Sequence, residues 1–390
     1  MFSPDLDQAL DLVTKLMAIP GKTGDEGKTA QVVIESLRAA GLPADALTID
    51  RCNERTPVPS DTGNLIIKLP GTRRAPRRLL MAHLDTVPIC VGSIPKRDGE
   101  RIVSGNPASG LGADNRAGCA VILTAALEIL RNKLPHPPLT FLFTIQEETG
   151  LHGARLIQPS VLAKPKLAFN WDGGNPAKVT IGATGGYRMT IDVKGRASHA
   201  GAAPEWGVSA IGIASLAIAD LVRGGWHGLI EKGRRRGTSN VGVIQGGDAT
   251  NVVTEQVAIR AEARSHDPKF RAKIISEIER SFQRAAKEVK NVAGEGGKVT
   301  IQGRADYESF RLADDDPSVV AAVAAAKEIG LSPELGISNG GLDANWMAVH
   351  GIPTVTLGCG QMFAHTTGEA LHIEQFQNAC RIGLLLATGT

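Results

Sequence analysis

A short apolar run that ends in two adjacent carboxylates is the feature that most constrains this chain. Residues 140–153 read TFLFTIQEETGLHG, and Leu139 to Ile145 are rich in β-branched and aromatic residues. Such a run is typical of a buried strand in an α/β sheet. Glu147 and Glu148 follow where turn residues must end the strand, so we expect their side chains to diverge toward a crevice at its carboxyl end. One could bind a metal while the other handles a proton, although the pair alone could also be an exposed acidic loop.

Length and composition narrow the class of protein. A chain of 390 residues exceeds the size at which single cores usually stop growing, so we expect two domains. The 43 basic residues nearly balance the 40 acidic ones, and only 4% of residues are aromatic, which argues against a nucleic-acid partner. We interpret the one basic cluster, Lys232 to Arg236, as a solvated loop.

The sequence also predicts a soluble, cytoplasmic protein. We find neither a secretory signal nor eighteen uninterrupted apolar residues, so we expect no membrane partner. The five cysteines are odd in number and scattered without CxxC spacing. This pattern favours reduced thiols in the cytoplasm.

A His-Asp pair ends a second predicted strand, Arg78 to Ala82. His83 and Asp85 are two residues apart, which places both side chains on the same side of an extended backbone. Asp85 can then accept the imidazole N–H, hold the ring in one tautomer and raise its basicity as a metal ligand. An ordinary His-Asp pair in a loop is the alternative.

Three further candidates follow the same pattern. Asp114 lies in a glycine-rich turn before an apolar helix, Arg116 to Leu130, where it could instead be a helix cap. Asp172 follows the predicted strand Leu167 to Asn170. His365 lies in the loop after the predicted strand Pro353 to Leu357.

Together these residues predict a metal site, because the carboxyl ends of strands in an open α/β sheet share one crevice. Two imidazoles and three carboxylates suit zinc, and also accommodate cobalt or manganese. Five ligands on one ion would leave little room for substrate, whereas a shared carboxylate could serve two ions about 3.5 to 4 Å apart. We therefore expect two metal ions, with Glu147 left as a free base; the five candidate ligands are His83, Asp114, Glu148, Asp172 and His365.

The pattern of the chain changes from about Thr184. The order there is β-α-β-β-α-β, which is a compact unit of the split βαβ kind. We interpret residues 183–306 as an inserted domain and residues 1–182 and 307–390 as the catalytic domain. The predicted elements of the insertion are strands Gly186–Lys194, Thr238–Gln245, Val252–Ala263 and Lys298–Gly303, and helices Pro204–Arg223 and Pro268–Lys290.

Eight motifs occur in the order and approximate spacing of the M20 family of metallopeptidases: HLDTVP, GADNRAG, EETG, WDGG, SHAG, GGDATNVV, GGLDAN and AHTTGE. The chain therefore resembles this family over essentially its whole length. Its peptidase T-like branch is most similar, through EETG, WDGG and IRAEARSHD at residues 259–267. The resemblance implies a zinc-exopeptidase-like three-layer α/β catalytic domain with an inserted α+β (split βαβ, ferredoxin-like) dimerisation domain.

The resemblance also implies roles for the candidate ligands. Asp114 would bridge two zinc ions and would be followed by a cis peptide bond. His83 and Asp172 would hold one ion, while Glu148 and His365 would hold the other.

Catalytic and substrate-binding roles are carried over in the same way. Glu147 would be the general base that takes a proton from the attacking water and passes it to the leaving amine, while Asp85 would orient His83. His199 would stabilise the developing oxyanion, frequently from the partner subunit of a dimer. Asn251 and Arg264 match positions that bind polar groups of the substrate, and an arginine suits bidentate recognition of a peptide carboxylate. Arg264 could instead be paired with a neighbouring acid, Glu262 or Asp267.

One position departs from the family pattern. Some members carry an arginine or tyrosine before the Gly-Gly of GGxDA, whereas this chain has Asn339, a candidate substrate contact. This leaves open how the terminal carboxylate of a substrate is held. It therefore also leaves open whether the enzyme prefers tripeptides.

The leading hypothesis is a dimeric di-zinc aminopeptidase of the tripeptidase type that acts on short peptides. The same site could serve an N-acyl amino acid amidohydrolase or a carboxypeptidase. A non-catalytic metal-binding module is the alternative of a different class, and Glu147 argues against it because a binder needs no base.

Overall fold

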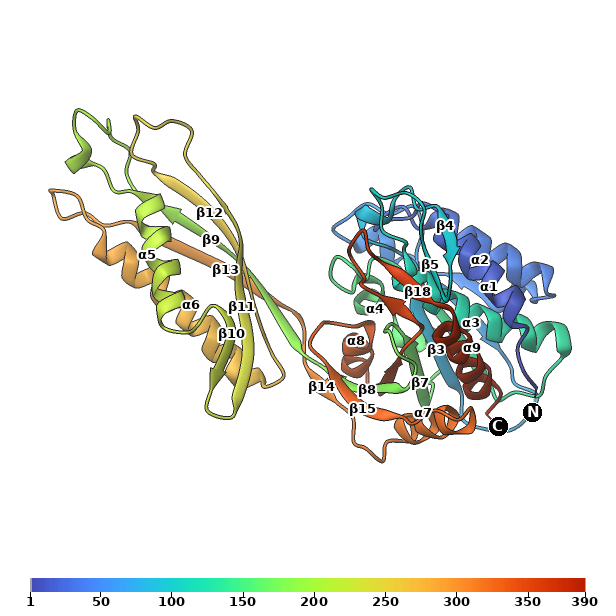
Figure 1. The fold of residues 1–390 in the computed structure, drawn as a ribbon. Coiled ribbons are helices and arrows are strands. Elements are labelled where there is room, and N and C mark those ends of the chain that lie inside the picture. Colours follow the sequence, from blue (N-terminus) through green and yellow to red (C-terminus); the bar gives the residue numbers. More distant parts are fainter. Residues whose placement is uncertain (1, 390) are drawn as a thin grey trace. The chain divides into compact units, whose positions relative to one another are not determined.

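The computed structural model describes residues 2–389, which form two compact units. One unit comprises the residues up to Ala183 and those from Arg311 onward, and Thr184–Phe310 form the other. The second unit is thus an insertion in the chain of the first (Figure 1). The first is mixed α/β and the second α+β, which confirms the predicted fold class.

Within the described residues, the first unit is built on a nine-stranded sheet whose central strands run parallel. These strands are buried along nearly their whole length, as expected where both faces of a sheet are covered. In spatial order they are β6 (Leu139–Thr144), β3 (Arg78–His83), β7 (Leu167–Trp171) and β16 (Thr354–Leu357). The other strands of this sheet are β1 (Leu47–Ile49), β2 (Leu65–Leu69), β8 (Lys178–Ala183), β14 (Phe310–Arg311) and β15 (Glu334–Ser338).

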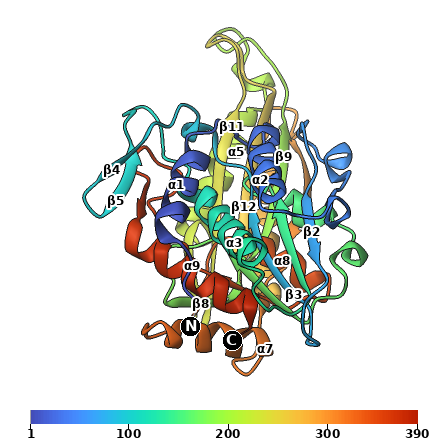
Figure 2. The same cartoon turned by 90° about the vertical axis from the view of Figure 1, so that its right-hand side faces the viewer.

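Helices cover both faces of this sheet. Leu79 and Met81 of β3 share a core cluster with Ala154 of α4 and Met347 of α8 on one face. On the other face α3 lies against β3 and packs on α1 and α9, which Figure 2 shows in front of the sheet. Alternate side chains of each strand thus pack against the helices on opposite faces of the sheet. The helices of this unit are α1 (Leu6–Met17), α2 (Gly27–Ala39), α3 (Ala113–Asn132), α4 (His152–Leu156), α7 (Pro317–Glu328), α8 (Asp343–Val349) and α9 (Ile373–Thr388).

A small second sheet in the same unit carries the segment that contains His365. Its spatial order is β17 (Gln361–Met362), β18 (Ala370–His372), β5 (Arg101–Ser104) and β4 (Pro95–Asp98). β17 and β18 pair antiparallel, so the residues between them form the loop of a hairpin. This arrangement brings the chain around His365 beside the chain that follows β5.

The inserted unit is a five-stranded antiparallel sheet, among the described residues, with two helices on one side (Figure 1). Its core is formed by alternate strand residues such as Ile191 and Ile259 together with Ile213 of α5 and Phe270 of α6. The elements are β10 (Gly228–Lys232), β11 (Arg235–Gln245), β12 (Gln256–Ser265), β9 (Gly185–Lys194) and β13 (Lys298–Tyr307), with α5 (Ala210–Arg223) and α6 (Pro268–Glu288).

Three predictions for this unit were wrong. The predicted order had four strands, but β10 is a fifth. The basic cluster at residues 232–236 is not a loop, because β10 and β11 form a tight hairpin around Gly233, which has a φ of 63°. α5 begins at Ala210 rather than Pro204, because Val208 pairs with Arg196 in an extended bridge and Ser209 then caps the helix.

Two expectations from composition concern the whole chain. No helix within residues 2–389 is both long and apolar enough to cross a membrane. The five cysteines are buried and none is in a disulfide in the described structure, which agrees with the reduced thiols that we expect.

Candidate metal centre

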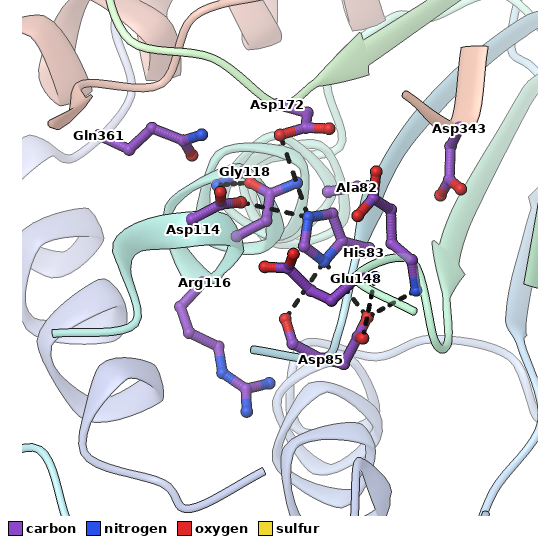
Figure 3. Close-up of polar contacts among 12 residues, drawn as sticks. Ala82, His83, Asp85, Asp114, Arg116, Gly118, Glu148, Asp172, Asp343 and Gln361 are labelled. Atoms are coloured by element: carbon purple, nitrogen blue, oxygen red, sulfur yellow. Dashed lines mark hydrogen bonds and ion pairs between the residues drawn. The ribbon is translucent and has the colours of Figure 1, made fainter. Parts of the chain in front are cut away.

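Candidate side chains gather where the central parallel strands end. His83 is the last residue of β3, Asp172 directly follows β7, and Glu147 and Glu148 lie shortly after β6. Because these strands are parallel neighbours, their carboxyl ends lie at the same edge of the sheet. Figure 3 shows Asp114 and Asp172 on two sides of the His83 ring, with Glu148 nearby.

The five predicted ligands form two groups that share Asp114. His83, Asp114 and Asp172 offer ligand atoms within 4.8 Å of one another, and so do Asp114, Glu148 and His365. Nε2 of His83 lies 3.2 Å from Oδ1 of Asp114, whereas Nε2 of His365 lies 3.4 Å from Oδ2. Each oxygen of Asp114 therefore faces a different histidine, which is the arrangement that a carboxylate between two ions needs.

Asp85 supports both the imidazole and the glutamate pair. Its Oδ1 lies 3.3 Å from Nδ1 of His83, which leaves Nε2 of that ring facing Asp114. The same carboxylate accepts backbone N–H groups from Glu147 at 3.0 Å and Glu148 at 3.3 Å, and the hydroxyl of Thr23 at 2.6 Å. The spacing of His83 and Asp85 predicted the first contact only; the structure adds that Asp85 holds the turn after β6.

Glu147 is buried beside the two groups without belonging to either. Burial raises the pKa of its carboxyl well above the usual range, and Asp172, Glu148 and Asp343 raise it further, while His83 opposes them. The side chain is thus placed to hold a proton next to the ligand atoms. A buried carboxyl with a raised pKa beside candidate metal ligands is a candidate acid-base group.

Asp114 does not cap the following helix. Asp114 and Asn115 have non-helical backbone angles near the start of α3, so the regular helix begins after them. Asn115 caps this regular part, because its Oδ1 accepts the backbone N–H of Gly118 at 3.0 Å while its amide donates to the carbonyl of Trp171 at 2.6 Å. Gly118 permits this close packing, since a Cβ there would lie 2.3 Å from that carbonyl oxygen. The peptide bond after Asp114 is cis, as the resemblance implies.

The shifted pKa values in the cluster indicate that its negative charge favours bound cations. Burial would lower the pKa of His83, but contacts with Asp114 and Asp85 raise it well above its usual value. Contacts with Asp114 and Glu148 raise the pKa of His365 to about 10. Burial and Asp114 raise the pKa of Asp172 to about 8. Buried negative charge in excess thus binds protons in the metal-free chain, and divalent ions would replace them.

The donor set also fits such ions chemically. Oδ1 of Asp114 is buried, and its 3.2 Å contact with Nε2 of His83 is not a well-formed hydrogen bond, so this oxygen could bind a cation in place of that contact. Imidazole and carboxylate groups are the ligands that zinc, cobalt and manganese accept. His83, Asp114 and Asp172 would hold one ion, and Asp114, Glu148 and His365 the other.

The remaining predicted residues belong to neither ligand group. His199, Asn251 and Arg264 belong to the inserted unit, where the backbones of residues 199–200 and 251–252 pair. Arg264 makes two 2.9 Å hydrogen bonds to Glu262, which is the alternative that we considered from the sequence. Asn339 is exposed in the loop before α8.

Sequence reasoning missed two buried carboxylates beside the cluster. Asp343 accepts a hydrogen bond from Thr144 at the end of β6, and Glu369 accepts backbone N–H groups from the loop before Asp114. Both lie in motifs of the resemblance, GGLDAN and AHTTGE, from which only His365 was selected, together with Asn339 just before GGLDAN.

An α/β sheet with two groups of histidine and carboxylate ligands at its carboxyl edge is the framework of a metal-dependent hydrolase. The chain belongs to peptidase family M20/M25/M40, whose family model matches residues 79–388, and it is a metallopeptidase.

Structures of two peptidases are similar to this chain over nearly its whole length. A tripeptidase from Staphylococcus aureus superposes with a TM-score of 0.88 at 29% sequence identity, covering 99% of each chain. Aminopeptidase PepT from Bacillus cereus has a TM-score of 0.84 at 30% identity, covering 99% of this chain and 98% of that one. These similarities support the peptidase T-like branch of the family.

A curated relative has a different specificity in its name. Carboxypeptidase G2 from Pseudomonas sp. (strain RS-16) is 30% identical over 366 residues, which cover 87% of this chain and 79% of the relative.

Proposed function

We propose that this chain is a two-metal aminopeptidase that removes the N-terminal residue of short peptides, tripeptides above all. The main observation behind this proposal is that the two oxygens of Asp114 face different histidines, each in a different group of ligands. The similarity to a tripeptidase and to PepT supports the choice of substrate. We take both ions to be zinc, with cobalt or manganese as substitutes.

When bound, the ions would polarise the scissile carbonyl and make water acidic enough to attack at neutral pH. Glu147 would take a proton from the attacking water and pass it to the leaving amine. Asp85 would keep His83 in one tautomer and, through the backbone N–H groups of Glu147 and Glu148, keep the base in place.

We propose that the inserted unit is a dimerisation and lid domain that supplies His199 to the site of the partner subunit. Nδ1 of His199 accepts backbone N–H groups from Gly201 at 3.2 Å and Ala202 at 3.0 Å, so its proton is on Nε2. The exposed ring thus presents a donor that suits an oxyanion. Asn251, whose carbonyl pairs with Ala200, would bind the substrate beside it.

Arg264 and Asn339 are weaker candidates for substrate contacts. Arg264 would have to release Glu262 before it could bind a peptide carboxylate. Asn339 would offer an amide where some members of the family carry an arginine or a tyrosine. We also propose that the enzyme acts in the cytoplasm, since its five buried thiols are in no disulfide in the described structure.

A carboxypeptidase or an N-acyl amino acid amidohydrolase is the second candidate, which the similarity to carboxypeptidase G2 favours. Such an enzyme would use the same ligands and the same base but would accept a blocked amino terminus. A metal-binding module without catalysis is the remaining alternative, and a buried Glu147 beside the ligands argues against it.

Substrate length and a free amino group can be tested together. The zinc-loaded protein should cleave a tripeptide and leave its N-acetylated form, a dipeptide and an N-acyl amino acid nearly intact, as measured by amine release. Preference for a blocked substrate would move the assignment to the carboxypeptidase or amidohydrolase. No cleavage by protein that contains two ions would support the binding module.

His199→Ala should lower kcat by about 10²- to 10³-fold, which is the usual cost of one lost oxyanion donor. His227→Ala is the matched control, because this histidine is in the same unit and its Nε2 already accepts the N–H of Val241. The measurement is steady-state kinetics on the tripeptide, and an unchanged kcat in His199→Ala would exclude the proposed role.

Mixed dimers test whether His199 acts across subunits. Chains with Glu147→Gln retain His199, and chains with His199→Ala retain Glu147. If the histidine acts on the partner's site, mixing the two inactive proteins under conditions of subunit exchange should restore activity at one site per mixed dimer. No recovery, with exchange verified by a mass tag, would place both residues in the same subunit's site.

A further inference from the structure

Glu369 is a buried carboxylate that bonds to the main chain of the loop containing Asp114. Its side chain is in the hairpin between β17 and β18, four residues after His365, and only 1% of the residue is exposed. Oε2 accepts the backbone N–H groups of Leu111 at 2.9 Å and Gly112 at 2.7 Å. Oε1 accepts that of Asp114 at 2.9 Å.

Glycines in this loop allow its backbone N–H groups to point at the carboxylate of Glu369. Gly112 has a φ of 81°, which ordinary side chains disfavour. A Cβ at residue 110 would lie 2.9 Å from the carbonyl oxygen of Thr366 and 3.1 Å from Oε2 of Glu369. Glycine at both positions thus lets N–H groups reach the carboxylate, and Cys90 adds a thiol contact at 3.2 Å.

The two oxygens of Asp114 contact only candidate ligands among the described histidines, so these contacts would not hold the residue in place once ions are bound. The oxygens face His83 and His365, and Oδ1 receives no well-formed hydrogen bond from a described residue. A ligand whose carboxylate must remain available for cations has to be held through its backbone. Glu369 provides this, and since its hairpin also contains His365, one segment positions two ligands.

We propose that Glu369 is a positioning residue for the metal centre, which holds Asp114 through its backbone N–H in register with His365 and is not itself a ligand. This inference rests on the ligands of the proposed function. Charged acceptors of backbone N–H groups form strong hydrogen bonds, and partners that orient metal ligands affect metal affinity directly.

Glu369→Gln is the test, because the amide keeps the size of the side chain but turns one acceptor into a donor that faces N–H groups. We expect affinity for zinc, measured by competition with a chromophoric chelator, to fall about 10- to 100-fold. The visible absorption of the cobalt-substituted protein should change, and kcat should fall more than KM changes. Glu374→Gln, at an exposed glutamate five residues further on, is the matched control and should leave all three unchanged.

Two measurements separate positioning from simple loop stability. Glu369→Asp keeps both acceptors on a shorter side chain, so its zinc affinity should lie between those of the native chain and Glu369→Gln. Zinc raises the melting temperature of a protein that binds it only in the folded state. In Glu369→Gln we expect this zinc-induced rise to decrease. The decrease should be larger than the drop in melting temperature that the substitution causes in the metal-free protein.

The proposal would be overturned if Glu369→Gln bound zinc with native affinity and the native cobalt spectrum, even with a lower melting temperature. If Glu369→Gln does not fold, Glu369→Asp provides the test. Native zinc affinity in this variant, together with a lower melting temperature of the metal-free form, would show that Glu369 has a structural role only. Failure of the native chain to bind two ions would instead reject the proposed function.

Discussion

Glu147→Gln is expected to lower kcat by about 10²- to 10⁴-fold, which is the usual contribution of a positioned acid-base group. The amide has the same shape but cannot accept a proton from water. Because Glu147 lies outside both ligand groups, the variant should still bind two ions per chain. Peptide hydrolysis and metal analysis on the same preparation provide the measurement.

Glu148→Gln is the matched control for this prediction, since the two glutamates are adjacent. Glu148 lies 2.9 Å from Nε2 of His365 in the second ligand group, so its replacement should lower metal content as well as activity. Loss of metal from Glu147→Gln, with retention in Glu148→Gln, would show that the roles of the two residues are reversed.

Asp114→Asn should weaken the binding of both ions by more than about 100-fold, which exceeds the effect expected of a residue that only orients a ligand. An amide offers one oxygen where the carboxylate offers two, so it cannot face both histidines as an acceptor. Activity should fall to background at metal concentrations that saturate the native enzyme. Metal titration of the dialysed protein provides the measurement.

Asp172→Asn is the comparison, because Asp172 belongs to the first ligand group only. This variant should lose one ion and keep most of its affinity for the other. If Asp114→Asn also lost only one ion, Asp114 would be a ligand of a single ion and the two-ion arrangement would be wrong.

Local patterns in the sequence predicted the parts of the site that depend on neighbours in the chain. The apolar runs ending at His83, before Glu147 and before Asp172 are strands β3, β6 and β7. That their carboxyl ends share one edge of the sheet follows from the general rule for open α/β folds. The i, i+2 spacing of His83 and Asp85 also predicted their contact.

Contacts between distant segments could not be predicted in this way. Glu369 and Asp114 are 255 residues apart, and the pairing of β18 with β5 helps to bring their segments together. The second role of Asp85, as acceptor for the turn at Glu147, likewise joins residues 62 positions apart. Asp343 was missed because a single aspartate in the first turn of a short helix predicts no more than a favourable interaction with the helix N-terminus.

Residue patterns along the chain were enough to predict which side chains follow the strands, that the fold has two units and, through its motifs, the family. Hydrophobic periodicity and turn residues act over a few positions, so they are readable in the chain. Only the tertiary structure decided that each oxygen of Asp114 faces a different histidine and that a buried glutamate holds its backbone. Those relations depend on how separate strands and loops pack in space, which no local pattern specifies.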